Sequence, residues 1–270
     1  MGVLNVTPDS FSDGGRFLDP EAAVEHGLEM ARQGADVVDV GGESSRPGAL
    51  PVAEEEELRR VVPVVAALAH HVRVSIDTVK PAVAAAAVEA GATLVNDISA
   101  SLWVLAARAG VGWVAMHMQG TPPAMQDDPR YDDVVAEVRA FLAARASAAV
   151  EAGVAEVWVD PGIGFGKTAG HNLSLLHHLP ELVADGYPVL VGTSRKGFLG
   201  RLSRPQGAEP EPVDARLPAS IATAAWAMLS GASMVRVHDV AGAVAAAELV
   251  GSTRRGGDGA GRLSAAAGGR

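Results

Sequence analysis

Polar and charged side chains stand at or just after the ends of short apolar segments along this chain. These positions hold Asn5, Glu43, Asp77, Asn96 with Asp97, His117, Asp160, Ser194 with Lys196, and Arg236 with His238. Asp77, Asn96 and Asp160 offer oxygen acceptors for the N–H groups of a flat heterocycle. Lys196 offers a donor for a ring oxygen or nitrogen. The set therefore predicts a site for a polar, planar ligand.

A second set of these residues is suited to an anion. Arg236 can lie over a π face and still reach a phosphate. With His238 and Asn5 it would form a cationic and polar pocket. Asn5 offers only an amide oxygen to a metal ion, so the expected ion is Mg²⁺, bound largely through water and substrate phosphates.

Each of these residues also has an ordinary structural explanation. Asp77, which precedes Thr78, has the residue type of a helix N-cap. Asn96 or Asp97 has the residue type of a turn cap. A lone His238 is more often a satisfied interior histidine than a ligand. A site is favoured because eight such coincidences at one predicted face are hard to explain separately.

A glycine-rich turn follows the strand-like run 157–160. Gly162, Gly164 and Gly166 leave the backbone bare, which predicts that a flat or anionic ligand approaches it closely. The ending Gly166-Lys167-Thr168 is similar to a nucleotide P-loop, but that motif needs glycine where Pro161 stands. A tight turn that caps a helix is the structural alternative.

Two long polar loops, residues 7–15 and 41–48, are typical of lids over a site. Phe11 stands alone in the first loop, and Pro47 and Phe165 lie in neighbouring predicted loops. We expect Phe11 to meet an aromatic co-substrate there. A hydrophobic contact between Phe11 and the rim of the domain is the alternative.

An alternation of strands and helices carries these polar positions. The expected strands are Gly2–Val6, Asp36–Val40, Arg73–Asp77, Thr93–Asp97, Gly112–His117, Glu156–Asp160, Pro188–Gly192 and Met234–His238. The expected helices are Pro20–Gln33, Val52–Ala69, Pro81–Ala90, Tyr131–Ala152, Asn172–Val183 and Leu217–Leu229. Eight such units in about 250 residues predict a single-domain α/β TIM barrel of parallel strands, with its site at their carboxyl ends. A doubly wound open sheet is the alternative, disfavoured because no GxGxxG motif follows the first strand.

Glycines mark the expected ends of helices before the next strand. They are Gly34, Gly91, Gly110, Gly153 and Gly231. The barrel is expected to occupy residues 1–250. Residues 251–270 are poor in large apolar side chains and are expected to form a flexible tail.

Composition excludes several classes of protein. The 270 residues contain no cysteine, which excludes disulfides and thiolate metal sites and fits a reducing cytosol. A net charge of −10 argues against nucleic acid or an anionic membrane as a partner. No run approaches the roughly 18 apolar residues of a membrane span. We therefore expect a cytoplasmic protein that acts on small molecules.

Eight motifs, in order from residue 1 to about residue 240, resemble those of the dihydropteroate synthase family of folate biosynthesis. They are MGVLNVTPDSFSDGG, DVGGESSRPGA, VSIDT, VNDIS, MHMQGTPPAMQ, DPGIGFGKTAGHN, PVLVGTSRKGFLG and VRVHDV. The resemblance implies a TIM barrel, usually dimeric, that joins 6-hydroxymethyl-7,8-dihydropterin diphosphate to 4-aminobenzoate. The products would be pyrophosphate and 7,8-dihydropteroate, with Mg²⁺ as cofactor. Sulfonamides are expected to compete with aminobenzoate.

The resemblance also implies a role for each matching residue. The pterin diphosphate would be bound by Asn5, Ser45, Asp77, Asn96, Asp160, Lys196, Arg236 and His238. The aminobenzoate site would be formed by Phe11, Ser45, Arg46, Pro47, Phe165 and Ser194. Catalytic roles would fall to Asp13, Asp77, Asp160, Lys196, Arg236 and His238. Asn5 would bind the Mg²⁺ ion, and Asp9 and Asp13 would belong to the closing first loop.

We expect a dissociative substitution in which the diphosphate leaves before the amine attacks. Asp77 and Asp160 would stabilise the positive charge left on the pterin methylene. The closed loops would exclude water, so that the arylamine captures the cation.

The chain departs from the family pattern in three places. Ser45 stands where many relatives have threonine. The chain begins inside the usual first strand, so the segment that caps the barrel floor is missing, and we expect a true start further upstream. The fourth strand–helix unit, residues 96–110, is short and contains an unexpected Trp103.

Two other functions stay open at this stage. A barrel that transfers a methyl group from methyl-tetrahydrofolate to a corrinoid protein would keep the pterin site but would not need the diphosphate residues. A non-catalytic pterin-binding paralogue would be expected to have lost Asp13, Arg46 or Lys196, and all three are present.

Overall fold

The computed structural model describes residues 1–7, 20–44, 50–121, 124–202, 204–205 and 208–254, with side chains described up to Gly251. Several sequence predictions lie outside these residues. They concern Asp9, Phe11, Asp13, Ser45, Arg46 and Pro47.

Eight parallel strands alternate with helices, as the sequence predicts. The strands are β1 Gly2–Asn5, β2 Val37–Gly41, β3 Arg73–Asp77, β4 Leu94–Asp97, β5 Gly112–Met116, β6 Val157–Asp160, β7 Leu190–Val191 and β8 Met234–Val235. The first six strands pair in sequence order, and β7 pairs with β8. Single bridges, Val159 with Val189 and Gly2 with Val237, join the two groups. The strands therefore close into a barrel.

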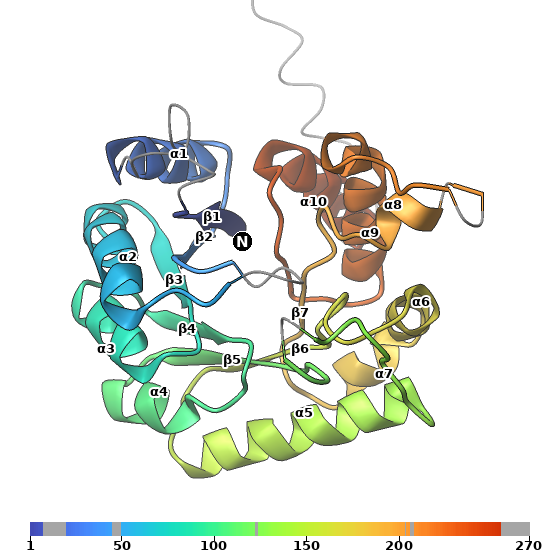
Figure 1. Cartoon of the computed structure of the whole chain (residues 1–270), viewed down its shortest axis with the longest axis horizontal. Coiled ribbons are helices and arrows are strands. Elements are labelled where there is room, and N and C mark those ends of the chain that lie inside the picture. The colour runs from blue at the N-terminus through green and yellow to red at the C-terminus, as the bar shows by residue number, and fades with distance from the viewer. Residues whose placement is uncertain (8–19, 45–49, 122–123, 203, 206–207, 255–270) are drawn as a thin grey trace, which may run out of the picture.

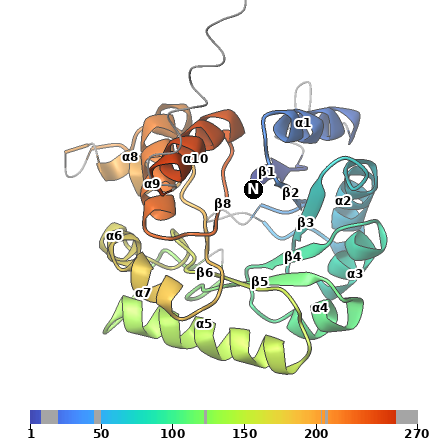
Figure 2. The same cartoon turned by 180° about the vertical axis from the view of Figure 1, so that it is seen from behind.

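The helices form a ring outside the strands. They are α1 Pro20–Arg32, α2 Glu54–Leu68, α3 Pro81–Glu89, α4 Trp103–Ala109, α5 Val134–Glu151, α6 Ala169–His177, α7 Leu179–Ala184, α8 Leu199–Leu202, η1 Val213–Arg216, α9 Leu217–Leu229 and α10 Val240–Arg254. Figure 1 shows the chain passing once around this ring from α1 to α10, and Figure 2 shows the same ring from behind. No helix among the described residues has the length and apolar character to cross a bilayer.

Two of the differences between the predicted and the observed helices have local reasons. Helix α5 begins at Val134, because the Asp133 carboxylate accepts from the N–H groups of Val135 and Ala136 at 3.0 and 3.1 Å. The single helix expected over residues 172–183 is instead two helices, α6 and α7. Pro180 lies in the first turn of the second helix, since proline fits the first turn of a helix but not its interior.

The predicted helix-ending glycines are confirmed. Gly34, Gly91, Gly110, Gly153 and Gly231 all have positive φ angles, from +68° to +115°. At the other end of the chain, α10 continues to Arg254 and so passes the predicted barrel boundary at residue 250.

The unexpected Trp103 has a packing role in α4. Its ring meets Trp113 edge-on at 5.8 Å, and the Arg145 guanidinium lies 5.3 Å from its centre. This arrangement lets a helix of one or two turns bury a large side chain against β5 and α5.

Side chains inside the barrel form layers, because alternate residues of a strand face the same side. Near the amino ends of the strands, the layer is apolar and contains Met1, Val37, Leu94, Val114 and Leu190, with Trp158 and Met234 packed against it. Two residues further along each strand, the layer contains Val3, Asp39, Ser75, Asn96, Met116, Asp160, Gly192 and Arg236. The barrel is therefore filled with apolar side chains near the amino ends and with polar ones nearer the carboxyl ends.

Candidate active site

A pocket of ≈ 40 Å³ lies at the carboxyl ends of the strands. Its lining brings together residues from five strands and from the loops that follow β4, β6, β7 and β8. They are Val3, Asp77, Asn96, Ile98, Met116, Asp160, Gly162, Ile163, Phe165, Gly192, Ser194, Lys196, Arg236 and His238. Several of the polar residues predicted from the strand ends thus converge, although Asp77 and Arg236, for example, are 159 positions apart along the chain.

Arg236 is held between two carboxylates. Its Nε donates to Asp39 Oδ2 at 2.6 Å, and its Nη2 donates to Asp77 Oδ2 at 2.7 Å. Asn96 Nδ2 donates to the same Asp39 oxygen at 2.9 Å. Asp39 therefore fixes both Arg236 and Asn96, one through an ion pair and one through a hydrogen bond.

Asp39 is the site residue that the strand-end pattern misses. It lies in the middle of β2, two residues before the end of the strand, and is fully buried. The available signal was a carboxylate inside an otherwise apolar strand, which is costly unless it is paired. Its other oxygen, and the hydroxyl of its register partner Ser75, have no hydrogen-bond partner among the described residues.

Burial shifts the titration of the charged groups in the pocket. It raises the pKa of Asp77 to about 7; Arg236 opposes this shift and Asp39 adds to it. Burial also raises the pKa of Asp160. It lowers the pKa of Lys196 to about 7, against the pull of Asp160. Burial opposes the charge on Arg236, but Asp39 and Asp77 outweigh it and raise the pKa of Arg236.

The glycine-rich turn after β6 gives Asp160 its immediate partner. The Gly162 N–H donates to Asp160 Oδ1 at 2.7 Å. Gly162, Gly164 and Gly166 all have positive φ angles. A Cβ atom at Gly162 or Gly166 would lie within 2.2 Å of a carbonyl oxygen in the loop after β5. These two glycines therefore allow close contact between protein loops, and Gly162 also lines the pocket. The close approach of a flat or anionic ligand to this turn stays a prediction.

Lys167 does not have the position of a P-loop lysine. Its Nζ points into the turn and donates to the carbonyls of Gly162 and Phe165, both at 3.0 Å. With 2% of its surface exposed, it is not available to a phosphate. The same turn places Phe165 in the pocket, where Lys196 Nζ lies 3.9 Å from the ring centre.

Ser194 and Lys196 reach the pocket from a sharp turn after β7. Arg195 between them has a φ of +60°, which is rare for a residue with a side chain. Its N–H donates to Ser220 Oγ at 2.9 Å, and its carbonyl accepts from Arg216 at 3.0 Å. The Ser194 hydroxyl oxygen accepts from the His238 N–H at 3.2 Å and lies 3.1 Å from His238 Nδ1.

Two of the strand-end residues belong to the scaffold instead of the pocket. Asp97 accepts from the N–H groups of Ser101 and Leu102 at 2.7 Å each and from the indole of Trp113 at 3.1 Å. Its alternative explanation as a turn cap is therefore confirmed. His117 accepts from Lys167, and burial lowers its pKa to about 3.

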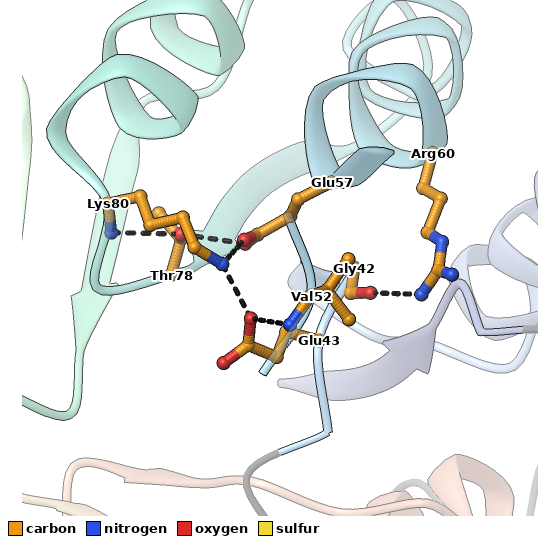
Figure 3. A network of polar contacts seen from close by, with 7 residues as sticks. All are labelled: Gly42, Glu43, Val52, Glu57, Arg60, Thr78 and Lys80. Atoms are coloured by element: carbon orange, nitrogen blue, oxygen red, sulfur yellow. Dashed lines mark hydrogen bonds and ion pairs between the residues drawn. The ribbon is translucent and has the colours of Figure 1, made fainter. Parts of the chain in front are cut away.

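Glu43 also belongs to the scaffold, at the base of the second loop (Figure 3). Its Oε2 accepts from Lys80 Nζ at 2.5 Å and from the Val52 N–H at 2.9 Å. Lys80 also donates to the buried Glu57, which accepts from the Thr78 hydroxyl at 2.7 Å. Arg60 donates to the carbonyl of Gly42 at 2.9 Å. The network ties both ends of the segment between Glu43 and Val52 to helix α2 and to the start of α3.

Asn5 ends β1, two residues after Val3, which lines the pocket. It therefore faces the same interior, nearer the carboxyl rim. Among the residues described, no three His, Asp or Glu side chains are grouped so as to hold a metal ion.

A family model described as "Pterin binding enzyme" matches residues 1–238, so the chain belongs to the pterin-binding enzymes.

Similar proteins are dihydropteroate synthases. That of Mycobacterium leprae is 51% identical over 263 residues, which are 93% of this chain and 92% of the relative. The Yersinia pestis dihydropteroate synthase, solved with a sulfonamide drug, has a TM-score of 0.86 and 45% identity over 94% of this chain and 93% of its own. The Xanthomonas albilineans enzyme with 4-aminobenzoic acid has a TM-score of 0.85 and 47% identity over 94% and 92%. These comparisons confirm the predicted resemblance and the predicted barrel.

Proposed function

We propose that this protein is an enzyme that condenses 6-hydroxymethyl-7,8-dihydropterin diphosphate with 4-aminobenzoate to give 7,8-dihydropteroate and pyrophosphate. One observation carries the proposal. Asp77, Asn96, Asp160, Lys196 and Arg236, from five different strands or strand ends, line a single pocket at the carboxyl face of the barrel. The relatives named above are dihydropteroate synthases, of which one is solved with a sulfonamide drug and one with 4-aminobenzoic acid.

The pterin ring would be bound by the acceptors and the donor on the pocket wall. Asp160 and Asn96 would accept from the ring N–H groups, while Lys196 would donate to a ring oxygen or nitrogen. Asp160 suits this role because its position is fixed by strand pairing and by the Gly162 N–H at 2.7 Å. Arg236 would cover the ring with its planar guanidinium, whose orientation is fixed by two carboxylates.

The diphosphate would lie toward His238, Asn5 and Arg236. His238 contacts Ser194 and lines the pocket. Mg²⁺ would be held by the amide oxygen of Asn5, together with water and the substrate's own phosphates, because the described part of the rim offers hard oxygen donors but no preformed cage. When bound, the ion would neutralise charge on the leaving diphosphate.

The charges support a dissociative mechanism. Departure of the diphosphate leaves positive charge on the pterin methylene, and Asp77 and Asp160 supply negative charge in a buried site. Such fixed electrostatic stabilisation is usually the largest catalytic contribution. The arylamine is already a free nucleophile at neutral pH, so the site needs no strong base for the attack.

Aminobenzoate would be bound beside the pterin methylene. Phe165 and Ser194 line the pocket and are the described residues of this predicted half-site. The other proposed residues of the aminobenzoate site are Phe11, Ser45, Arg46 and Pro47. Asp13 would act from the first loop, which is proposed to close over the site. Sulfonamides would occupy the same place, as competitors of aminobenzoate.

We further propose that residues 1–250 act as one barrel unit and that the enzyme is a cytoplasmic homodimer. Absence of cysteine fits a reducing compartment. Helix α9 exposes Leu217, Trp226 and Leu229 at 41%, 36% and 59%, and α10 packs beside it. Light scattering on the wild-type protein and on Trp226→Lys tests this: a dimeric mass that falls to half in the variant is expected. A monomeric wild type would refute the homodimer.

A coupled pyrophosphate-release assay tests the proposed reaction. Release that requires both substrates, and that a sulfonamide suppresses unless aminobenzoate is raised, is the expected result. No release from correctly folded protein would favour a non-catalytic paralogue. Methyl transfer from methyl-tetrahydrofolate without pyrophosphate release would favour the corrinoid-linked alternative.

A further inference from the structure

Lysine is rare in this protein, and all three lysines lie at the carboxyl-terminal rim of the barrel. Lys80, Lys167 and Lys196 are the only lysines among 22 lysine and arginine residues. Lys196 lines the pocket, and Lys80 ties the base of the second loop. Lys167 has no part in the reaction proposed above. Only 2% of its surface is exposed, and burying such a group is costly unless its hydrogen bonds are made.

The Lys167 ammonium group holds the turn of residues 161–168 from beneath. It donates to the carbonyls of Gly162 and Phe165 at 3.0 Å each. It also donates to His117, at 2.9 Å to Nδ1 and 3.2 Å to the carbonyl. One group therefore ties two points of the turn to each other and to the end of β5. The N–H groups of a compact lysine head group can be shared among these four acceptors. The N–H groups of a planar guanidinium point outward in one plane and do not suit this place.

We infer that Lys167 is a positioning residue: it fixes the position of Phe165 and, through that ring, the position in which aminobenzoate binds. The inference rests on the proposed function. Phe165 lines the pocket, and its N–H donates to the Gly162 carbonyl at 3.0 Å. Its ring lies 3.9 Å from Lys196 Nζ. Loss of the lysine head group would leave the Phe165 carbonyl without this donor and the Gly162 carbonyl with only the Phe165 N–H, so the backbone that carries the ring would be held less firmly.

The effect should fall on aminobenzoate more than on the pterin. Asp160, the main pterin acceptor, ends a strand and is held by its pairing with Met116, so it depends only in part on the Gly162 N–H of the turn. Its carbonyl also accepts from the His117 N–H at 3.0 Å. Phe165 lies five residues further along, at the middle of the turn, and depends on the turn's own contacts.

The groups around Lys167 keep it the donor in its hydrogen bond with the His117 ring. Burial, followed by the charge of Lys167, lowers the pKa of His117 to about 3, so its ring accepts a hydrogen bond from Lys167 at neutral pH. Burial also lowers the pKa of Lys167 itself to about 7, against the pull of Asp160. Asp160 and Lys196 are the other charges that face Lys167.

The test compares Lys167→Met and Lys167→Arg with Tyr131→Phe. The Tyr131 hydroxyl donates to the Gly166 carbonyl at 2.8 Å, so this control removes a donor from the same turn, and Tyr131 does not line the pocket. We expect both lysine variants to raise the KM for aminobenzoate about tenfold or more with little change in kcat, since a loosened binding surface weakens the ground state and the transition state alike. The Kd of pterin diphosphate by calorimetry, and kcat, should change less than about threefold, and Tyr131→Phe should leave all three near wild type.

A double-mutant cycle with Phe165→Ala separates positioning from general support. If Lys167 acts through Phe165, then adding Lys167→Met to Phe165→Ala should raise the KM no further. An independent increase, an unchanged KM, or full rescue by Lys167→Arg would overturn the inference.

Folding of each variant is checked by circular dichroism, with Lys167→Gln as a milder change. Failure of both Lys167→Met and Lys167→Gln to fold would overturn the inference in favour of a structural role. Wild type is assayed first. No pyrophosphate release there would count against the proposed function, whereas normal release with an unchanged variant KM would overturn only the role of Lys167.

Discussion

Asp39 should control the pH at which Asp77 becomes charged, and Asp39→Asn tests this. Both carboxylates accept from one Arg236 guanidinium, at 2.6 and 2.7 Å. The fixed fork of that group places the carboxylates roughly 5 Å apart. At an effective dielectric constant of about 20, their repulsion is about 3 kcal/mol, which equals about 2 pKa units. Removing the Asp39 charge should therefore lower the pKa of Asp77 from about 7 by about 2 units.

The expected change appears in the pH profile of kcat/KM for pterin diphosphate, which reports the free enzyme. If the ionised Asp77 stabilises the pterin cation, wild-type activity rises as pH increases through about 7. In Asp39→Asn this acid limb should move to lower pH. The alkaline limb, which follows the pKa of Lys196 at about 7, should not move to lower pH, because Asp39 is not among the causes of that shift and a charged Asp77 raises the pKa of Lys196.

Ser75→Ala is the matched control. Ser75 is the register partner of Asp39 and is equally buried, but it carries no charge. Its replacement should leave both limbs in place. Titration of the Asp77 carboxyl by carbon NMR gives the same pKa directly. An acid limb and an NMR pKa that are the same in wild type and Asp39→Asn would refute the reasoning.

Three further predictions follow from the same contacts. Lys196→Ala should weaken pterin-diphosphate binding by about 1.5–3 kcal/mol through loss of a charged hydrogen bond, and unchanged affinity by calorimetry would remove Lys196 from the site. The folded protein holds the Asp77 proton more tightly than the unfolded chain, so this group's contribution to the free energy of unfolding should be lost as pH rises from 3.8 to about 7. Urea unfolding of Asp77→Asn should lack that dependence, and equal slopes in the two proteins would contradict it. Lys80→Met should cost about 3 kcal/mol because it leaves Glu57, which is 1% exposed, without its cation. Arg139→Met breaks two ion pairs, with Glu181 and Asp185, that are more exposed than the pair of Lys80 with Glu57, so it should cost less than about 1 kcal/mol. Equal losses would contradict the difference in burial.

The sequence was most informative where a polar residue ends an apolar strand. Asp77, Asn96, Asp160, Lys196 and Arg236 were predicted to meet, and they line one pocket. That prediction works because the carboxyl ends of all parallel strands in a barrel face the same side. It needs no knowledge of helix boundaries, which were predicted less well.

The rest depended on contacts between segments distant in the sequence. Asp39 lies inside a strand, and only its register with Ser75 and its pairing with Arg236 make it part of the site. Asp97 has the same strand-end position as its neighbour Asn96, but the two side chains face opposite sides of the strand. Lys167 has the sequence context of a phosphate ligand, yet it turns onto carbonyls of its own loop. Sequence spacing does not specify these directions without the partner segments.

The most direct test is a crystal structure of the protein with a non-hydrolysable analogue of the pterin diphosphate. The ring should lie in the pocket between Asp160, Asn96 and Lys196, with Arg236 over its face and the diphosphate toward His238 and Asn5. A pterin bound elsewhere, or bound here with Asp160 and Lys196 out of hydrogen-bond reach of the ring, would contradict the account.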